Sequence, residues 1–96
     1  MKKKIALNFK VPVSIFREGK AYIAYSPVLD LSTSALSFEK VKKRFNEAVT
    51  ILVEELMEMG TLDEVLSDLG WKKVARQWQS PLPITHEMAN VSVPLN

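Results

Sequence analysis

The sequence predicts an α+β domain: a three-stranded antiparallel meander, then a long helix, a short helix and a C-terminal strand. Two patterns predict it. Apolar residues occupy every second position from Ile5 to Ile15, which is typical of a strand with one buried face. Between Phe38 and Leu69 they recur at spacings of three and four, which is typical of amphipathic helices. The length of 96 residues suits one domain, and 47% hydrophobic and 25% charged residues make an ordinary globular composition.

The meander is expected in the first third of the chain. Its strands, in order, span residues 5–15, 21–25 and 28–33. Pro12 cannot donate to a strand ladder, so it places the first strand at a sheet edge or a bulge. Residues 17–20 form a hairpin loop in which Gly19 supplies the positive φ of a tight turn. Short links between consecutive strands make the sheet antiparallel.

Two helices follow, spanning residues 38–59 and 62–69. Ser37 is the expected N-cap of the first helix, and Gly60 ends it in the left-handed conformation that glycine favours. Thr61 and Glu64 have the spacing of a capping box, in which each side chain accepts from an otherwise unpaired backbone N–H at the start of the second helix. Gly70 closes that helix.

The pattern is weaker beyond Gly70. Residues 71–78 fit either a strand or a helical turn, and Pro81 and Pro83 break any helix after them. Residues 79–87 are therefore expected to be extended. The chain divides into a domain of residues 1–79 and a C-terminal extension, residues 80–96, which we call the C-terminal arm.

The end of the C-terminal arm alternates again. Val91, Val93 and Leu95 are separated by single residues, which predicts a last strand. An apolar strand beyond a proline-rich segment can exchange onto the sheet edge of another copy. We therefore expect a homodimer or higher oligomer with these three residues at the interface.

The residue types argue against catalysis. The chain has no cysteine, which excludes disulfides, zinc thiolate sites and thiol nucleophiles. His86 is the only histidine, and a lone imidazole neither completes a zinc site nor acts as a base without a nucleophile or an orienting acid. With three glycines and no GxGxxG or P-loop, no phosphate-binding loop is expected. We expect a protein that is not an enzyme and holds no cofactor or metal.

The apolar segments are short. None has the uninterrupted run of a secretory signal or the ~20 apolar residues that span a bilayer. A cytoplasmic protein without a membrane partner is expected.

Asp30 is the acid most suited to chemistry, because it lies near a strand beside Ser32, Thr33 and Ser34. It could bind a metal or act as a base. The alternative, which we favour, is that Asp30 and these hydroxyls satisfy backbone groups where the chain turns toward the helix.

Trp71 and Trp78 flank the basic residues Lys72, Lys73 and Arg76. Interleaved aromatic and basic side chains can grip single-stranded nucleic acid by stacking and charge. Tryptophan is equally a favoured anchor at protein interfaces. A third interpretation is that both indoles cap the open end of a small core.

The stretch from residue 13 to residue 70 resembles the HicB-like antitoxin family. The segments that carry the resemblance are IFREGK at 15–20, YIAYSPVLDLST at 22–33, NEA at 46–48, EEL at 54–56, GTL at 60–62 and LG at 69–70. The block around Tyr22, Tyr25, Pro27 and Asp30 is the most specific part. Two positions depart from the family: Ala35 and Leu36 stand where a glycine and an acid are usual.

The resemblance implies a truncated ribonuclease H-like fold without nuclease activity, because the metal-binding acid of the first strand is missing. It also implies that the protein binds and neutralises a small HicA-type ribonuclease toxin by occlusion. The residues expected to meet the partner are Tyr22, Tyr25, Pro27, Asp30, Trp71 and Trp78. Residues 71–96 are too short and too rich in proline for a helix-turn-helix, so direct operator binding is not expected.

The second hypothesis is a small nucleic-acid-binding or regulatory domain. It would use the basic residues 2–4 and 42–44 together with residues 71–78. Phosphate contacts would make its affinity fall steeply with salt.

Overall fold

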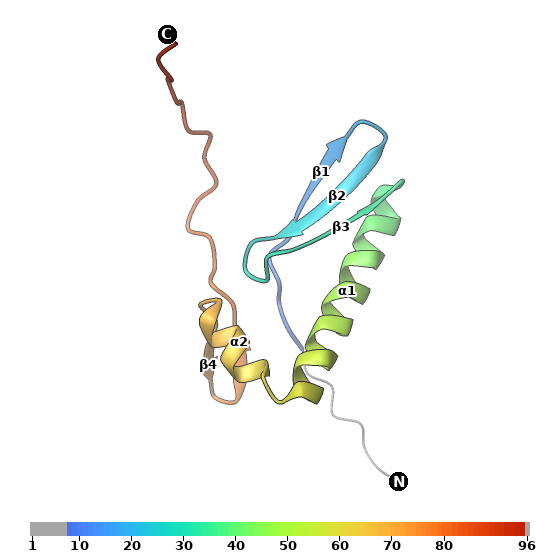
Figure 1. Cartoon of the computed structure of the whole chain (residues 1–96), viewed down its shortest axis with the longest axis vertical. Helices are drawn as coiled ribbons and strands as arrows, with labels where there is room; N and C mark the ends of the chain where they lie inside the picture. Colours follow the sequence, from blue (N-terminus) through green and yellow to red (C-terminus); the bar gives the residue numbers. More distant parts are fainter. Residues whose placement is uncertain (1–7, 96) are drawn as a thin grey trace.

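The computed structural model describes residues 8–95 and confirms the α+β layout. Its elements in order are β1 (Ser14–Glu18), β2 (Ala21–Ser26), β3 (Leu31–Ala35), α1 (Phe38–Met59), α2 (Leu62–Asp68), β4 (Lys72–Val74) and β5 (Gln77–Gln79). The first three strands form an antiparallel sheet in the order β1-β2-β3, and the last two form a separate hairpin. α1 packs along one face of the sheet, and the C-terminal arm extends away from the rest of the chain (Figure 1).

The first strand is shorter than the alternation predicts. It begins at Ser14, whereas residues 8–13 run extended without a strand partner and residues 5–7 lie outside the described chain. The reason lies in the neighbouring strand. Ser14 pairs with Tyr25, and β2 ends one residue later, so it offers no ladder to the preceding segment. Gly19, in the two-residue loop before β2, has φ +62°, which confirms the predicted hairpin.

The third strand begins later than predicted. Residues 27–30 form a turn, and β3 starts at Leu31, which pairs with Ser26. Val28 and Leu29 are buried in this turn and not in a strand. Asp30 has φ +49°, a left-handed conformation that aspartate tolerates better than most residues.

Both predicted ends of α1 are confirmed. The Ser37 hydroxyl accepts from the Lys40 backbone N–H at 3.1 Å, which satisfies one of the unpaired donors of the first turn. At the other end Gly60 has φ +69°, and its N–H donates to the Met57 carbonyl. The Thr61 N–H donates to the Leu56 carbonyl, which completes a Schellman motif.

The predicted capping box at Thr61 is wrong. The Thr61 side chain makes no capping hydrogen bond, and its Oγ1 is buried without a partner. An N-cap residue needs an extended backbone. Thr61 has φ −113° and ψ 6° because its N–H is already used to end α1, so its hydroxyl is not aimed at the start of α2.

The chain beyond α2 forms a hairpin and then an unpaired arm. Gly70, with φ +91°, turns the chain into β4, and Ala75 and Arg76 make the two-residue loop to β5. Both loop residues have positive φ, the geometry of the turns that suit hairpins. The predicted last strand at residues 91–95 is wrong for the single chain, because these residues pair with no described strand.

The core consists of two connected clusters. The first lies between the sheet and α1 and is formed by Ala24, Ala35, Val41 and Phe45. The second lies under the turn between β2 and β3 and is formed by Val28, Leu29, Leu66 and Trp71. Val11, Leu31 and Val49 pack against both clusters and join them.

Trp71 is the largest residue of the second cluster, and only 3% of its surface is exposed. Its Nε1 donates to the buried carbonyl of Val28 at 2.8 Å. The Phe9 ring meets the indole edge to face, with 6.0 Å between ring centroids. Trp71 therefore joins the end of α2, the turn between β2 and β3, and the segment before β1.

We predict that Trp71→Phe lowers the free energy of unfolding by about 1–3 kcal/mol, because the Val28 carbonyl loses its donor and stays buried. Urea unfolding measures this change. Trp78→Phe is the matched control, since Trp78 is only half-buried and should change stability less. Equal losses in the two variants would contradict the structural role of the Trp71 hydrogen bond.

Candidate binding surface

The two faces of the β1-β2-β3 sheet have different surroundings. Side chains alternate between faces along each strand. Ala24 and Ala35 belong to the face that packs against α1. We call the opposite side the outer face; the register places on it Ser14, Phe16, Glu18, Ala21, Ile23, Tyr25, Ser32 and Ser34.

The centre of the outer face is apolar. Phe16 pairs with Ile23 across β1 and β2, and Tyr25 follows on the same side of β2. Phe16 is 55% exposed, although it is one of the largest apolar side chains of the sheet. Serine hydroxyls from β1 and β3 border these three residues. Adjacent apolar side chains with a polar rim are a composition found at protein-binding surfaces.

Three of the predicted partner-binding residues lie at one end of the outer face. The Tyr25 hydroxyl donates to the Asp30 carboxylate at 3.3 Å, and Pro27 is exposed in the turn between them. The hydrogen bond fixes the orientation of the phenol ring. Asp30, in the turn after β2, therefore accepts a hydrogen bond from the side chain of Tyr25. We had expected it to accept from backbone groups where the chain turns toward the helix.

The same contact changes the acidity of the tyrosine. Desolvation raises the pKa of Tyr25 above its usual value, and the Asp30 charge and hydrogen bond raise it further. The phenol is accordingly neutral and able to donate throughout the physiological range. Tyr25 serves here as a hydrogen-bond donor and an apolar surface, and not as a base.

Tyr22 lies on the other face of the sheet, because it is three residues before Tyr25. It packs against the first cluster and meets Phe38 edge to face at 6.3 Å. Arg17 stands over the Tyr22 ring at 5.7 Å, and Lys42 over the Phe38 ring at 5.2 Å. These four residues form what we call the cation–aromatic ladder, on a surface separate from the outer face.

The tryptophans do not form the predicted partner-binding pair. Trp71 is buried, so of the three interpretations only a place in the core fits it. Trp78 is half-buried against the second cluster, and Lys73 stands over its ring at 5.7 Å. Neither indole is free to stack on bases as an open platform.

The other predicted groups are dispersed. His86 is exposed on the C-terminal arm. Within residues 8–95 no three histidine, cysteine or acidic side chains gather in a group able to hold a metal ion. No helix in the described part of the chain is long and apolar enough to cross a membrane. Leu36, one of the two departures from the family pattern, is 78% exposed, whereas Ala35 is buried where β3 ends.

Comparison with known protein families, with curated proteins and with solved structures finds no match to this chain. The candidate surface therefore rests on its own geometry. Phe16 and Ile23 are the large apolar residues of this surface that the sequence reasoning missed. The two-residue loop at Gly19 fixes the pairing of β1 with β2 and so sets Phe16 opposite Ile23. Ile23 is two residues before Tyr25 on the same strand, so the three side chains lie on one face of the sheet.

We predict that Asp30→Asn lowers the pKa of Tyr25 toward its usual value, because the neighbouring negative charge is removed. The asparagine keeps the left-handed backbone. In the folded wild type the phenol holds its proton more tightly than in the unfolded chain, so the free energy of unfolding falls as the pH rises through the range in which tyrosine ionises. This fall should be larger in the wild type than in the variant.

The measurement is the ultraviolet titration of tyrosinate in a Tyr22→Phe background. The chain has two tyrosines, so this background reports Tyr25 alone. An unchanged midpoint in the Asp30→Asn variant would show that the carboxylate does not act on the phenol.

Proposed function

We propose that this protein is an antitoxin-like binding protein that neutralises a small HicA-type ribonuclease toxin with its outer face. Two observations support the proposal. Residues 13–70 carry the sequence resemblance to HicB-like antitoxins. The outer face presents the exposed Phe16 beside Tyr25, whose hydroxyl is held by Asp30. The exposed apolar centre of this face is the observation that carries the proposal.

Neutralisation would occur by occlusion, without bond chemistry. Phe16 and Tyr25 would supply the anchors that dominate binding energy, because large rings bury much surface at little entropic cost. Glu18 lies at the end of β1, beyond Phe16, and Asp30 lies in the turn beyond Tyr25, so one carboxylate stands at each end of the outer face. A ribonuclease must present positive charge to its RNA, so acids at the rim favour encounter with that face.

We predict that Phe16→Ala abolishes protection of cells that express a HicA-type toxin from a neighbouring reading frame, and weakens complex formation at least tenfold. Loss of a central aromatic anchor costs on the order of 2 kcal/mol, which exceeds a factor of ten in affinity. Co-expression growth assays and titration of the purified proteins measure the two effects.

Phe38→Ala is the matched control. Phe38 is also an exposed phenylalanine, 46% against 55% for Phe16, but it belongs to the cation–aromatic ladder. It should protect cells as well as the wild type does. If the wild type itself binds no HicA-type toxin, the proposal is wrong; if both variants fail equally, the outer face is not the binding surface.

The cation–aromatic ladder favours a second candidate, binding of single-stranded nucleic acid. It places two cations beside two aromatic rings that meet edge to face, on residues from β1, β2 and α1. Rings stack on bases, and cations contact phosphates, without a need for sequence readout. This location replaces the tryptophan segment of the original hypothesis, because Trp71 is buried.

We predict for this candidate that Lys42→Ala weakens binding of single-stranded RNA and reduces the slope of log affinity against log salt by about 0.7, the contribution of one phosphate contact. Fluorescence anisotropy over a salt series measures both. Lys73→Ala is the control, since Lys73 also stands over an aromatic ring but outside the ladder. No binding at low salt would remove this candidate.

A further inference from the structure

The C-terminal arm exposes apolar surface that the core of its own chain leaves uncovered. Six of its side chains are 73–100% exposed: Leu82, Ile84, Met88, Val91, Val93 and Leu95. None of them belongs to either core cluster. The arm also makes the molecule long: the radius of gyration is 16.8 Å, against about 12–13 Å for a compact domain of this length.

The base of the arm is fixed, so the arm leaves the domain in a defined direction. The Ser80 hydroxyl donates to the Lys10 carbonyl at 3.3 Å. The Pro81 ring lies close to Gly70: a Cβ added to Gly70 would be 3.3 Å from the proline Cγ. Pro81 and Pro83 hold the backbone extended, and the arm runs away from its own α1 (Figure 1).

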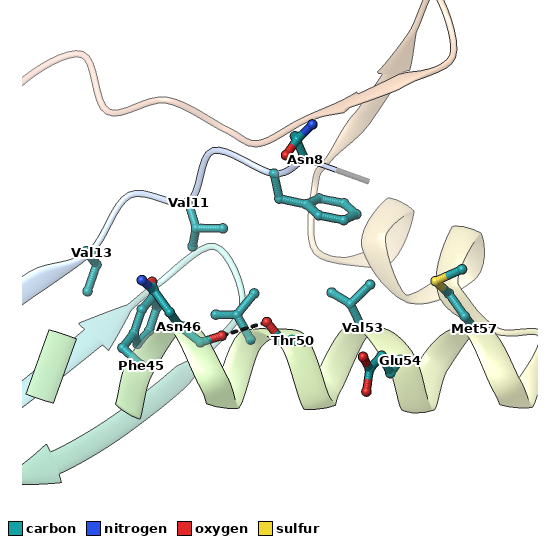
Figure 2. A pocket seen from close by; sticks show the side chains of 11 residues that line it. Asn8, Val11, Val13, Phe45, Asn46, Thr50, Val53, Glu54 and Met57 are labelled. Carbon is teal, nitrogen blue, oxygen red and sulfur yellow. Dashed lines mark hydrogen bonds between the residues drawn. The ribbon is translucent and has the colours of Figure 1, made fainter. Parts of the chain in front are cut away.

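A groove of about 570 Å³ lies between α1 and the unpaired residues 8–13. Its apolar walls come from Phe45, Val49, Val53 and Met57 of α1 and from Phe9, Val11 and Val13 on the other side. In Figure 2 Val11 and Val13 point toward α1, while Asn46 and Thr50 stand at the side of the helix. This volume is in the range of sites that hold a ligand the size of a short peptide.

The end of the arm matches this groove in spacing. Val91, Val93 and Leu95 lie on one side of an extended segment, about 6.7 Å apart. The α1 residues of the groove recur every fourth position, about 6 Å apart along the helix. Side chains with these two spacings can interdigitate over three positions.

The arm and the groove also match in charge. Residues 88–95 contain no charged side chain. Among the described residues that line the groove, Glu54 alone is charged. Inserting this end of the arm therefore removes few charges from water, which would otherwise oppose burial.

The available area is sufficient for a stable dimer. Burying one aliphatic side chain removes about 60–120 Å² of apolar surface. The three side chains of residues 91–95 on each of two arms give roughly 360–720 Å², and the groove surface that they cover adds about as much again. Stable interfaces bury about 1,200–2,000 Å² in total.

We propose that residues 91–95 of a second copy of this chain occupy the groove, and that two copies exchange arms reciprocally. The direction of the arm favours a second copy over the arm's own groove. Reciprocal exchange gives each groove one arm and closes the assembly with twofold symmetry. The inference is independent of the proposed toxin binding, which uses the outer face.

Cysteine cross-linking tests the proposal directly, because the chain has no cysteine of its own. Thr50→Cys, at the side of the groove, and Val93→Cys, in the arm, are prepared as separate full-length proteins, mixed, unfolded, refolded together and treated with a short bismaleimide. We expect a covalent dimer that contains one copy of each variant. The control replaces Thr50→Cys by Glu55→Cys, an exposed position on α1 outside the groove, and should cross-link at least tenfold less.

Absence of the mixed dimer, or equal yields with the control, would overturn the proposal. So would a double variant, Thr50→Cys with Val93→Cys, that cross-links only within one chain, because the arm would then occupy its own groove. Mass spectrometry of the cross-linked peptides distinguishes the two products.

Light scattering of the full-length protein gives an independent readout. Val93→Asp should halve the apparent mass of the wild type, because the described groove residues offer the new carboxylate no cation and include the acidic Glu54. Val93 is 73% exposed in the single chain, so the substitution leaves the domain folded. Leu36→Asp, at a residue that is 78% exposed elsewhere, should leave the mass unchanged. A monomeric wild type, or a dimeric Val93→Asp variant, would overturn the proposal.

Discussion

The hydrogen bond from the Trp71 indole to the Val28 carbonyl joins two parts of the chain that are 43 residues apart. The second core cluster is built around it. The indole fills the second cluster above Leu66, whose carbonyl also accepts from the Trp71 backbone N–H. Gly70 makes this double contact possible, because its positive φ turns the chain back over α2. The hairpin and the base of the C-terminal arm follow directly from that position.

Both core clusters lie on the α1 side of the sheet, and this arrangement leaves the outer face available. An antiparallel sheet can be covered on one face and solvated on the other. In such a sheet the solvated face is usually polar, but here it carries Phe16 and Ile23 at its centre. Apolar surface that the fold does not use, with Tyr25 fixed at one end by Asp30, is what makes this face the candidate binding surface.

Local signals in the sequence predicted the bounds of β2 and of both helices to within one residue. Ser37 and Gly60 bound α1 because caps act on backbone groups within a few residues. Predictions were wrong where the end of an element depends on its partner strand and not on its own sequence. The alternation before β1 continues past the end of its partner strand, so residues 8–13 stay unpaired. The β4–β5 hairpin was missed because Ala75 and Arg76 take positive φ without the glycine or asparagine that usually announces such a turn.

The sequence by itself determined the α+β class, the two helices and the segment that holds Tyr25 and Asp30, because propensity, periodicity and capping are properties of short stretches. Only the tertiary structure decided which of these residues lie on the outer face and which are covered. Strand register places Tyr22 and Tyr25 on opposite faces of the sheet. Burial of Trp71 depends on contacts with residues 43 or more positions away, which no local pattern encodes.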